Sequence, residues 1–252
     1  MSRALDGRRA LITGATANIG AATARLFAQE GARLVLVDRD PAIEDTAAAI
    51  RESGGDASAV VADVSSADAV DALAPVVDER LRGLDVLVNN AAIQRVGLVE
   101  SIPVEEWDEI FAINVRGYFL TVRALLPALR ASDAAAIVNT SSQTGLHGAP
   151  GATAYSATKG AVIALTKALA LELASDGIRV NAIAPGWVDT AFNTPAITML
   201  GGADAHADIV RATIPLGRQG RPEEIAAGTL YLASAASSYM TGQVLAVDGG
   251  VT

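Results

Sequence analysis

The stretch Thr13-Gly14-Ala15-Thr16-Ala17-Asn18-Ile19-Gly20 decides the fold, because it joins a strand-like run to a helical pattern. The apolar run Arg8–Thr13 precedes it, and the helical pattern Ile19–Glu30 follows it. Small residues let backbone N–H groups approach a pyrophosphate, whose charge then lies at a helix N-terminus. A glycine pattern alone is a weak signal, but this strand–turn–helix context predicts a phosphate-binding turn.

The same alternation of strand and helix continues along the chain. Most strand-like runs are continuously apolar, as parallel strands covered on both faces are. The pattern predicts an α/β fold, a doubly wound parallel sheet of the Rossmann type with about seven strands and helices on both faces. The expected strands are Arg8–Thr13, Arg33–Val37, Ser58–Ala62, Val86–Val88, Ala136–Asn139, Arg179–Ile183 and Val244–Val247. The expected helices are Ile19–Glu30, Ile43–Ser53, Ala67–Arg80, Glu105–Arg130, Thr153–Ser175 and Pro222–Ala233.

The length of 252 residues suits one α/β domain. There is no internal repeat and no low-complexity linker, so we predict a single domain over residues 1–252. The segment 189–221 is rich in Gly, Pro and Thr, with a short helical pattern near Asp204–Thr213. We expect this segment to be an insertion that forms a substrate lid.

Composition excludes several classes of protein. Because the chain has no cysteine, disulfides, thiolate catalysis and cysteine-ligated metals are excluded. With only two histidines, His147 and His206, we expect no metal site. The net charge of -9 and the aromatic content of 4% make a nucleic-acid partner unexpected.

Two signals that point toward a membrane are both interrupted. Arg8-Arg9 resembles the start of a twin-arginine export signal, but the polar turn from Thr13 onward ends the apolar segment at once. The uncharged run Ile225–Val247 is long enough to span a bilayer, but glycine, serine and glutamine break it up. We therefore expect a cytoplasmic protein with no membrane partner.

Asp38 favours one of the two nicotinamide dinucleotides. It follows the strand Arg33–Val37, about twenty residues beyond the glycine turn, where a carboxylate can accept hydrogen bonds from both hydroxyls of an adenine ribose. It would also repel a ribose 2′-phosphate. Arg39 could pair with such a phosphate, but Ala17 adds no basic group in the turn. The expected cofactor is NAD, with NADP the less favoured alternative.

Tyr155 and Lys159 stand four residues apart on a helical pattern, which places both side chains on one helix face. A tyrosine titrates near ~10 and is a poor base at neutral pH. A nearby ammonium favours the phenolate, and oxidised nicotinamide would add a second positive charge, so Tyr155 could serve as a general base near neutral pH. Ser142 follows the fifth expected strand, and strand C-termini face the ligand crevice of such sheets. Its hydroxyl could donate to a substrate oxygen.

These motifs together resemble the short-chain dehydrogenase/reductase family over about residues 7–250. The glycine turn resembles its Thr-Gly-x-x-x-Gly-x-Gly pattern, with Asn18 in place of the middle glycine. Asn is the non-glycine residue that best tolerates a left-handed backbone, so the turn is compatible. Asn89-Asn90-Ala91-Ala92 resembles Asn-Asn-Ala-Gly, and Pro185-Gly186-Trp187-Val188-Asp189-Thr190 resembles Pro-Gly-x-x-x-Thr.

The resemblance implies a role for each matching residue. The implied catalytic set is Asn114, Ser142, Tyr155 and Lys159, with Ser141 as the alternative serine; Asn114 would hold a water that continues a proton relay through the lysine. The implied cofactor contacts are Gly14, Thr16, Asn18, Ile19, Gly20, Asp38, Asp63, Val64, Asn90, Ala91, Tyr155, Lys159, Pro185, Gly186, Val188 and Thr190, with Asn89 also on the adenosine side. Members of the family are usually tetramers, so a homotetramer is expected.

The expected pocket residues are polar and apolar side chains around the catalytic set: Gln94, Ser142, Gln143, His147, Tyr155 and Trp187. This mixture favours a small polar substrate, such as a polyol, a sugar or a hydroxy ketone. The predicted function is an NAD(H)-dependent oxidoreductase that interconverts a secondary alcohol and its ketone. The alternatives are a 3-oxoacyl-thioester reductase that uses NADPH and a non-catalytic dinucleotide sensor.

Overall fold

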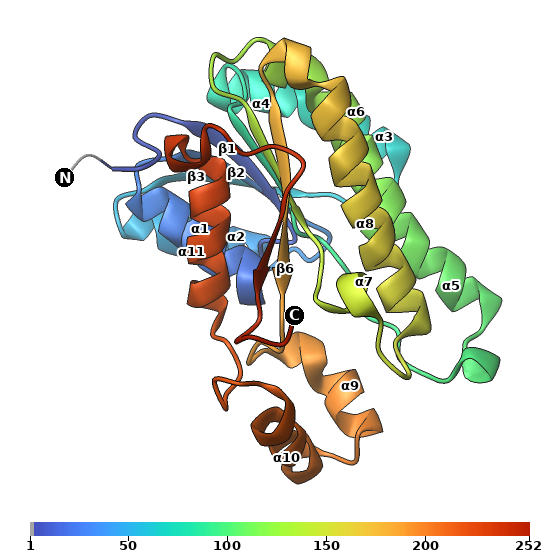
Figure 1. The fold of residues 1–252 in the computed structure, drawn as a ribbon. Coiled ribbons are helices and arrows are strands. Elements are labelled where there is room, and N and C mark those ends of the chain that lie inside the picture. Colours follow the sequence, from blue (N-terminus) through green and yellow to red (C-terminus); the bar gives the residue numbers. More distant parts are fainter. Residues whose placement is uncertain (1–2) are drawn as a thin grey trace.

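The computed structural model describes residues 3–252, and within them seven parallel strands form one sheet in the order β3-β2-β1-β4-β5-β6-β7. The order reverses between β1 and β4, so a crevice opens there at the carboxyl ends of the strands. Helices cover both faces of the sheet (Figure 1). The predicted doubly wound fold is confirmed.

The strands are β1 (Arg9–Thr13), β2 (Arg33–Asp38), β3 (Asp56–Val61), β4 (Val86–Asn89), β5 (Ala136–Thr140), β6 (Arg179–Pro185) and β7 (Val244–Val247). The longer helices are α1 (Asn18–Gln29), α2 (Ile43–Glu52), α4 (Leu73–Leu81), α5 (Val104–Phe111), α6 (Gly117–Arg130), α8 (Thr153–Glu172), α10 (Ala203–Thr213) and α11 (Pro222–Ala233). The shorter helices are α3 (Ala67–Asp71), α7 (Thr144–His147) and α9 (Thr194–Met199).

Two hydrophobic cores explain why the strands are apolar at successive positions. In β1, Ala10 and Ile12 point into the core beneath α1, α2 and α11, whereas Leu11 points into the core beneath α4, α6 and α8. In β2, Leu34 and Val35 divide between the two cores in the same way. Side chains alternate across a strand, so a sheet with two covered faces needs apolar residues at both.

Two helices expected to be continuous are interrupted. The pattern Ala67–Arg80 divides into α3 and α4, because Pro75 has no N–H and its ring would clash with the carbonyl of Asp71 in a continuous helix. The pattern Glu105–Arg130 divides into α5 and α6 around a π-helical turn, Ala112–Arg116. Such turns insert an extra residue and re-aim the side chains next to it.

The segment 189–221 carries more helix than expected. Helix α10 matches the predicted helical piece, but a 3₁₀ turn at Ala191–Asn193 and helix α9 precede it. Pro195 lies in the first turn of α9, where its fixed φ suits a helix start. Both α9 and α10 lie beyond the carboxyl ends of the strands (Figure 1). Across residues 3–252, no helix combines the length and the apolar character needed to cross a bilayer.

Candidate active site

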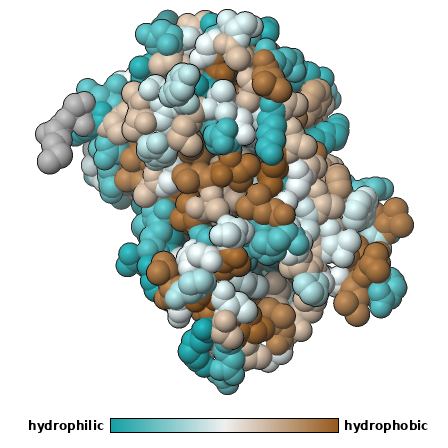
Figure 2. All heavy atoms as spheres, viewed as in Figure 1, coloured by the Kyte–Doolittle hydropathy of each residue, from teal (hydrophilic) through white to brown (hydrophobic). Residues whose placement is uncertain are grey.

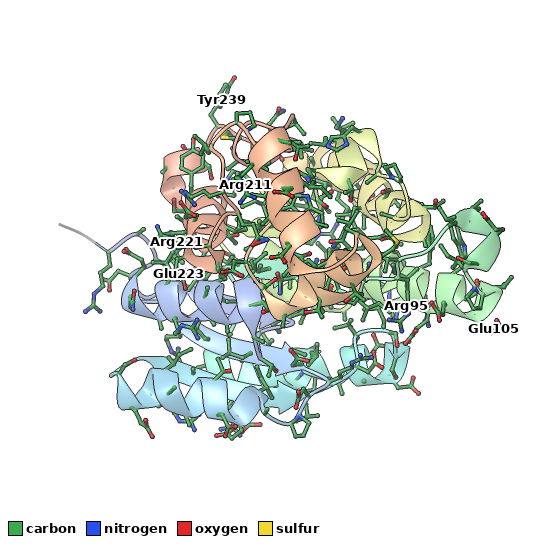
Figure 3. All side chains as sticks on the ribbon, turned by 90° about the horizontal axis from the view of Figure 1, so that it is seen from below. Arg95, Glu105, Arg211, Arg221, Glu223 and Tyr239 are labelled. Atoms are coloured by element: carbon green, nitrogen blue, oxygen red, sulfur yellow. The ribbon has the colours of Figure 1, made fainter. Side chains whose placement is uncertain are left out.

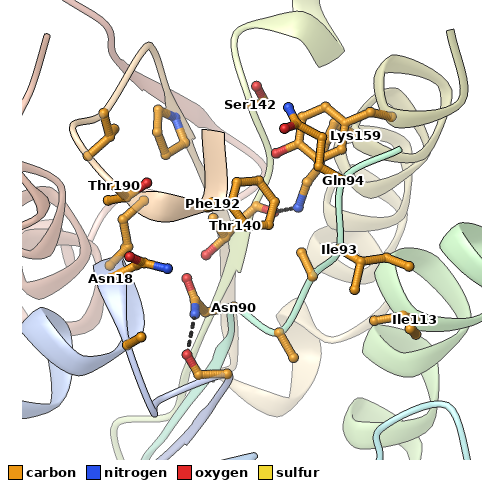
Figure 4. A pocket seen from close by; sticks show the side chains of 18 of the residues that line it. Asn18, Asn90, Ile93, Gln94, Ile113, Thr140, Ser142, Lys159, Thr190 and Phe192 are labelled. Carbon is orange, nitrogen blue, oxygen red and sulfur yellow. Dashed lines mark hydrogen bonds between the residues drawn. The ribbon is translucent and has the colours of Figure 1, made fainter. Parts of the chain in front are cut away.

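A cavity of about 380 Å³ lies at the carboxyl ends of the strands, where the sheet order reverses. Its walls come from the loops after β1, β2, β3, β4, β5 and β6 and from α8. Figure 4 shows Asn18 and Asn90 on one side of it and Ser142, Gln94 and Lys159 on the other. One cavity therefore joins the predicted cofactor turn to the predicted catalytic side chains.

The glycine turn has the backbone that its sequence requires. Gly14 has φ +68°, and Asn18 has φ 53°, the left-handed conformation expected at that position. The Asn90 Nδ2 donates to the Gly14 carbonyl at 2.9 Å and ties this turn to the loop after β4. Gly14, Thr16, Asn18 and Ile19 line the cavity, so backbone groups at the start of α1 are open to a phosphate.

Gly20 departs from its expected role as a cofactor contact, because it does not line the cavity. A Cβ there would lie 1.9 Å from the Gly14 carbonyl oxygen and 2.7 Å from the Asn90 Nδ2. Gly20 is therefore needed for the close approach of α1 to the turn and acts on the site through packing.

The end of the cavity next to β2 carries Asp38, the carboxylate predicted to bind an adenine ribose, and is called the adenosine end below. Asp38 lies at the end of β2, and its carboxylate accepts hydrogen bonds from the backbone N–H of Thr16 at 3.1 Å and of Asp40 at 3.2 Å. The Thr16 hydroxyl oxygen is buried and has no partner within residues 3–252. Arg39 also lines this end, and no ion pair holds it in that part of the chain.

The loops after β3 and β4 complete that end of the cavity through Asp63, Val64, Asn90 and Ala91. Asn89 does not join them, which corrects its expected contact with adenosine. Its amide is fully buried and bonds to Asn139 at 2.9 Å and Thr121 at 2.7 Å. Asn89 ends β4 with its side chain on the sheet face that α6 covers, whereas the next residue, Asn90, lines the cavity.

Ser142, Tyr155 and Lys159 all line the cavity. The Lys159 Nζ donates to the Thr140 carbonyl at 2.8 Å and lies 5.6 Å from the centre of the Tyr155 ring. Helix α7, which follows β5, packs tightly on α8. A Cβ added at Gly145 would lie only 2.6 Å from the Lys159 carbonyl carbon, so this position needs glycine. Ser141 also lines the cavity, but its hydroxyl donates to the Lys159 carbonyl at 2.9 Å, whereas Ser142 is the serine that interacts with the Tyr155 phenol.

Burial shifts the pKa of both titratable groups in this set. It raises the pKa of the Tyr155 phenol well above its ordinary value, and a hydrogen bond with Ser142 offsets only part of that rise. Burial lowers the pKa of the Lys159 amine to about 7. The Tyr155 phenol is therefore protonated at neutral pH in the protein without cofactor, and its role as a base, predicted for Lys159 and oxidised nicotinamide acting together, stays a prediction.

Asn114 lies in the π-helical turn, fully buried and outside the cavity lining. Its amide oxygen accepts from the Ile93 N–H at 2.9 Å, and its Nδ2 donates to the Ile93 carbonyl at 2.9 Å and to the Thr158 hydroxyl at 3.2 Å. Both donor hydrogens are thus used within the protein. Asn114 joins the loop after β4 to the helix that carries Tyr155 and Lys159.

Pro185, Gly186, Val188 and Thr190 line the cavity below β6, as expected for cofactor contacts. Gln94, Gln143 and Trp187 line it as expected for substrate contacts. His147 is not among the lining residues, which corrects its expected substrate contact. It ends the single turn of α7, is exposed, and bonds through Nδ1 to the Gly148 carbonyl at 2.7 Å.

Phe192 is a lining residue that the sequence did not single out. Its ring centre lies 6.1 Å from that of Tyr155, so the segment after β6 reaches the predicted catalytic side chains. Only its position, two residues after Thr190 in the expected lid, could have identified it. Figure 4 shows its ring between the two sides of the cavity.

Fold and site together define a dinucleotide-binding oxidoreductase, and comparison with known proteins gives the family. The family described as Enoyl-(Acyl carrier protein) reductase matches residues 14–252. The chain belongs to the short-chain dehydrogenase/reductase family.

Two relatives illustrate the range of activities nearby. The chain is 43% identical to the galactitol 2-dehydrogenase (L-tagatose-forming) of Cereibacter sphaeroides, over 98% of this chain and 96% of that protein. It is 40% identical to the 3-oxoacyl-[acyl-carrier-protein] reductase of Thermotoga maritima, over 98% of both chains.

Solved structures agree with the fold and differ in their dinucleotide. An NAD⁺-bound xylitol dehydrogenase superposes with a TM-score of 0.92 at 34% identity, covering 98% of this chain and 99% of its own. A protein from Beutenbergia cavernae assigned as an NAD(P)-dependent gluconate 5-dehydrogenase, with NADP bound at low occupancy, also has a TM-score of 0.92, at 37% identity over 100% of this chain and 99% of its own.

Proposed function

We propose that this protein is an NAD(H)-dependent dehydrogenase that interconverts a secondary alcohol of a small polyol, sugar or hydroxy compound with its ketone. The observation that carries the proposal is the single cavity that joins Asp38 and the glycine turn to Ser142, Tyr155 and Lys159. The likeness to a galactitol dehydrogenase and a xylitol dehydrogenase supports a polyol.

The cavity residues divide into those that would hold each part of the cofactor. The turn at Gly14, Thr16, Asn18 and Ile19 would hold the pyrophosphate, and Asp38 would accept hydrogen bonds from the adenine ribose. A carboxylate there disfavours the extra phosphate of NADP. Asp63, Val64, Asn90 and Ala91 would contact the adenosine, and Pro185, Gly186, Val188 and Thr190 the nicotinamide carboxamide.

Nicotinamide, when bound, supplies the hydride acceptor for oxidation and the hydride donor for reduction. Ser142 would donate a hydrogen bond to the substrate oxygen and hold it beside Tyr155. In reduction, Tyr155, whose raised pKa keeps the phenol protonated at neutral pH, would give its phenolic proton to that oxygen. In oxidation, Tyr155 must first lose the proton, and Lys159 would stabilise the resulting phenolate.

Asn114 serves this chemistry as a positioning residue. Through Ile93 and Thr158 it fixes the loop after β4 against α8, and the Thr158 hydroxyl in turn donates to the Tyr155 carbonyl at 2.8 Å. A water held near this residue would continue a proton path from Lys159, as the family resemblance implies.

Reduction of a 3-oxoacyl thioester with NADPH is the second candidate. The matching family description and the 40% identity to an acyl-carrier-protein reductase favour it, whereas Asp38 opposes NADPH. Initial rates with NAD and NADP on a panel of secondary alcohols, and with NADH and NADPH on an acetoacetyl thioester, separate the two. Alcohol turnover with NAD supports the first function; thioester reduction with NADPH and no alcohol turnover supports the second.

The Tyr155→Phe substitution tests the chemical assignment. It should leave NADH binding intact and lower turnover by about 10²–10⁴-fold, the usual contribution of a general acid or base. NADH binding by fluorescence and steady-state rates measure the two effects. Turnover at the wild-type rate would show that Tyr155 is not the acid or base.

A further inference from the structure

Two glutamine side chains in the cavity have amide oxygens without a hydrogen-bond partner. Both the Gln94 and the Gln143 Oε1 are buried, and neither finds a donor anywhere in residues 3–252. Gln143 is only 7% exposed. A buried acceptor left unpaired costs about 1–3 kcal/mol, so two in one cavity are unusual unless a ligand satisfies them.

The backbone holds Gln94 in place from both sides. Before it, both the N–H and the carbonyl of Ile93 bond to the Asn114 amide at 2.9 Å. After it, Arg95 pairs with Glu106 at 3.6 Å and Glu109 at 2.5 Å, and its Nη1 donates to the Gln94 carbonyl at 3.2 Å. Figure 3 shows Arg95 beside α5. The position of Gln94 is thus fixed before any ligand binds.

Gln143 is held as firmly and lies next to the catalytic serine. Its N–H donates to the Pro185 carbonyl at 2.9 Å, and its own carbonyl accepts from the Leu146 N–H at 2.9 Å. Its neighbour Ser142 interacts with Tyr155. Figure 4 shows Gln94 on the same side of the cavity as Ser142 and Lys159. Both amides therefore belong to the substrate end, away from Asp38.

The charged side chains at the substrate end of the cavity favour a neutral ligand. Of the lining residues, Asp38, Arg39, Asp40 and Asp63 belong to the adenosine end, and Lys159 is the cationic side chain at the substrate end. Arg95 is occupied by two glutamates. A carboxylate on the substrate would have no free guanidinium there, whereas an amide suits a hydroxyl, which both donates and accepts.

We propose that Gln94 and Gln143 recognise a hydroxyl next to the reacting carbinol, so that this site selects neutral vicinal diols over isolated alcohols. The inference rests on the proposed function, and it adds which part of the substrate is recognised and by which residues. A hydroxyl at that position has one hydrogen, so it would donate to one of the two oxygens and could accept from the Nε2 of the other amide, whereas an alkyl group would pair with neither. Sites built to bond a hydroxyl reject analogues that lack it for this reason.

The test compares kcat/KM with NAD for a vicinal cyclohexanediol and for cyclohexanol, which differ by one hydroxyl. We expect wild type to prefer the diol by about 10–100-fold, the range for one or two hydrogen bonds. Gln94→Leu and Gln143→Leu should each lower that ratio by about tenfold. Gln29→Leu, on the exposed face of α1, is the matched control and should keep the wild-type ratio. An equal ratio in wild type and the double variant would overturn the proposal.

A binding experiment separates this proposal from the proposed function. The Tyr155→Phe protein loaded with NAD⁺ should bind the diol more tightly than cyclohexanol by calorimetry, and adding Gln94→Leu and Gln143→Leu should abolish the difference. If wild type oxidises no alcohol but this preference holds, the proposed function fails and the recognition by the amides stands. Equal binding, including no detectable binding of either compound, contradicts the recognition. Retained NAD⁺ binding shows that each variant is folded.

Discussion

Lys159 is a fully buried amine, and its burial has a cost that depends on pH. Its folded pKa of about 7 lies below the ordinary value of 10.5, so the folded protein binds fewer protons than the unfolded chain between these values. The free-energy cost of burying Lys159 is therefore fully present below pH 7 and is lost as the pH rises through 10.5. The catalytic role proposed for Lys159 would therefore oppose stability.

The Lys159→Met substitution should reveal that cost. The variant should lack activity, yet its free energy of unfolding without cofactor should exceed that of wild type by about 1–4 kcal/mol near pH 6, the range for replacing buried charges by apolar side chains. The gap should shrink toward pH 9. Urea denaturation at the two pH values measures it, and a gap that does not change with pH would contradict the assigned burial cost.

Asn18 tests the left-handed backbone of the phosphate-binding turn. Asn18 has φ 53°, which alanine adopts at a cost and glycine adopts freely. Asn18→Ala should therefore lower the free energy of unfolding by about 1 kcal/mol, whereas Asn18→Gly should leave it almost unchanged. Because the turn faces the cavity, Ala should also weaken NAD binding. Urea midpoints and NAD titrations report the two effects. Equal stability of the Ala and Gly variants would show that the turn relaxes without cost.

At the scale of elements, Asp85 joins the amino ends of the central strands. Burial alone would raise its pKa, but hydrogen bonds from the Arg9 side chain and N–H and from Ser132 lower it from 3.8 to about 2. The stabilisation is present above pH 3.8 and is lost as the pH falls through 2. Asp85→Asn should therefore lose about 2 kcal/mol at neutral pH. Denaturation at pH 7 and near pH 2 checks this, because the difference should disappear in acid.

The elements also show which parts of the site the sequence could predict. The strands could be predicted because the two cores require apolar residues at successive positions. Asp38 and Ser142 could be predicted from their places at strand ends, and Tyr155 from its helical spacing to Lys159. The π-helical turn could not be predicted from local sequence, and its Asn114 bonds to Ile93, which lies far away along the chain. His147 was misplaced because one turn of α7 carries it outward.

At the scale of the whole molecule, large apolar side chains remain exposed on the long helices. Phe119 on α6 is 49% exposed and Leu171 on α8 is 84% exposed. Figure 2 shows hydrophobic atoms gathered at the outer end of α5, where Leu98, Val99 and Val104 are exposed. Tyr239 projects from the surface before β7 (Figure 3). Such side chains on several faces favour burial between subunits.

The family resemblance implies a homotetramer, and the exposed side chains on the long helices give a direct test of it. Phe119→Glu and Leu171→Glu each place a charge on a surface that the assembly would bury, so light scattering at micromolar concentration should show smaller species than the wild-type tetramer. Val61→Glu is the matched control, because Val61 is 59% exposed at the end of the edge strand β3, outside those helices. It should leave the tetramer intact. A monomeric wild-type protein would remove the prediction, and a tetramer that survives both helix substitutions would place the interface elsewhere.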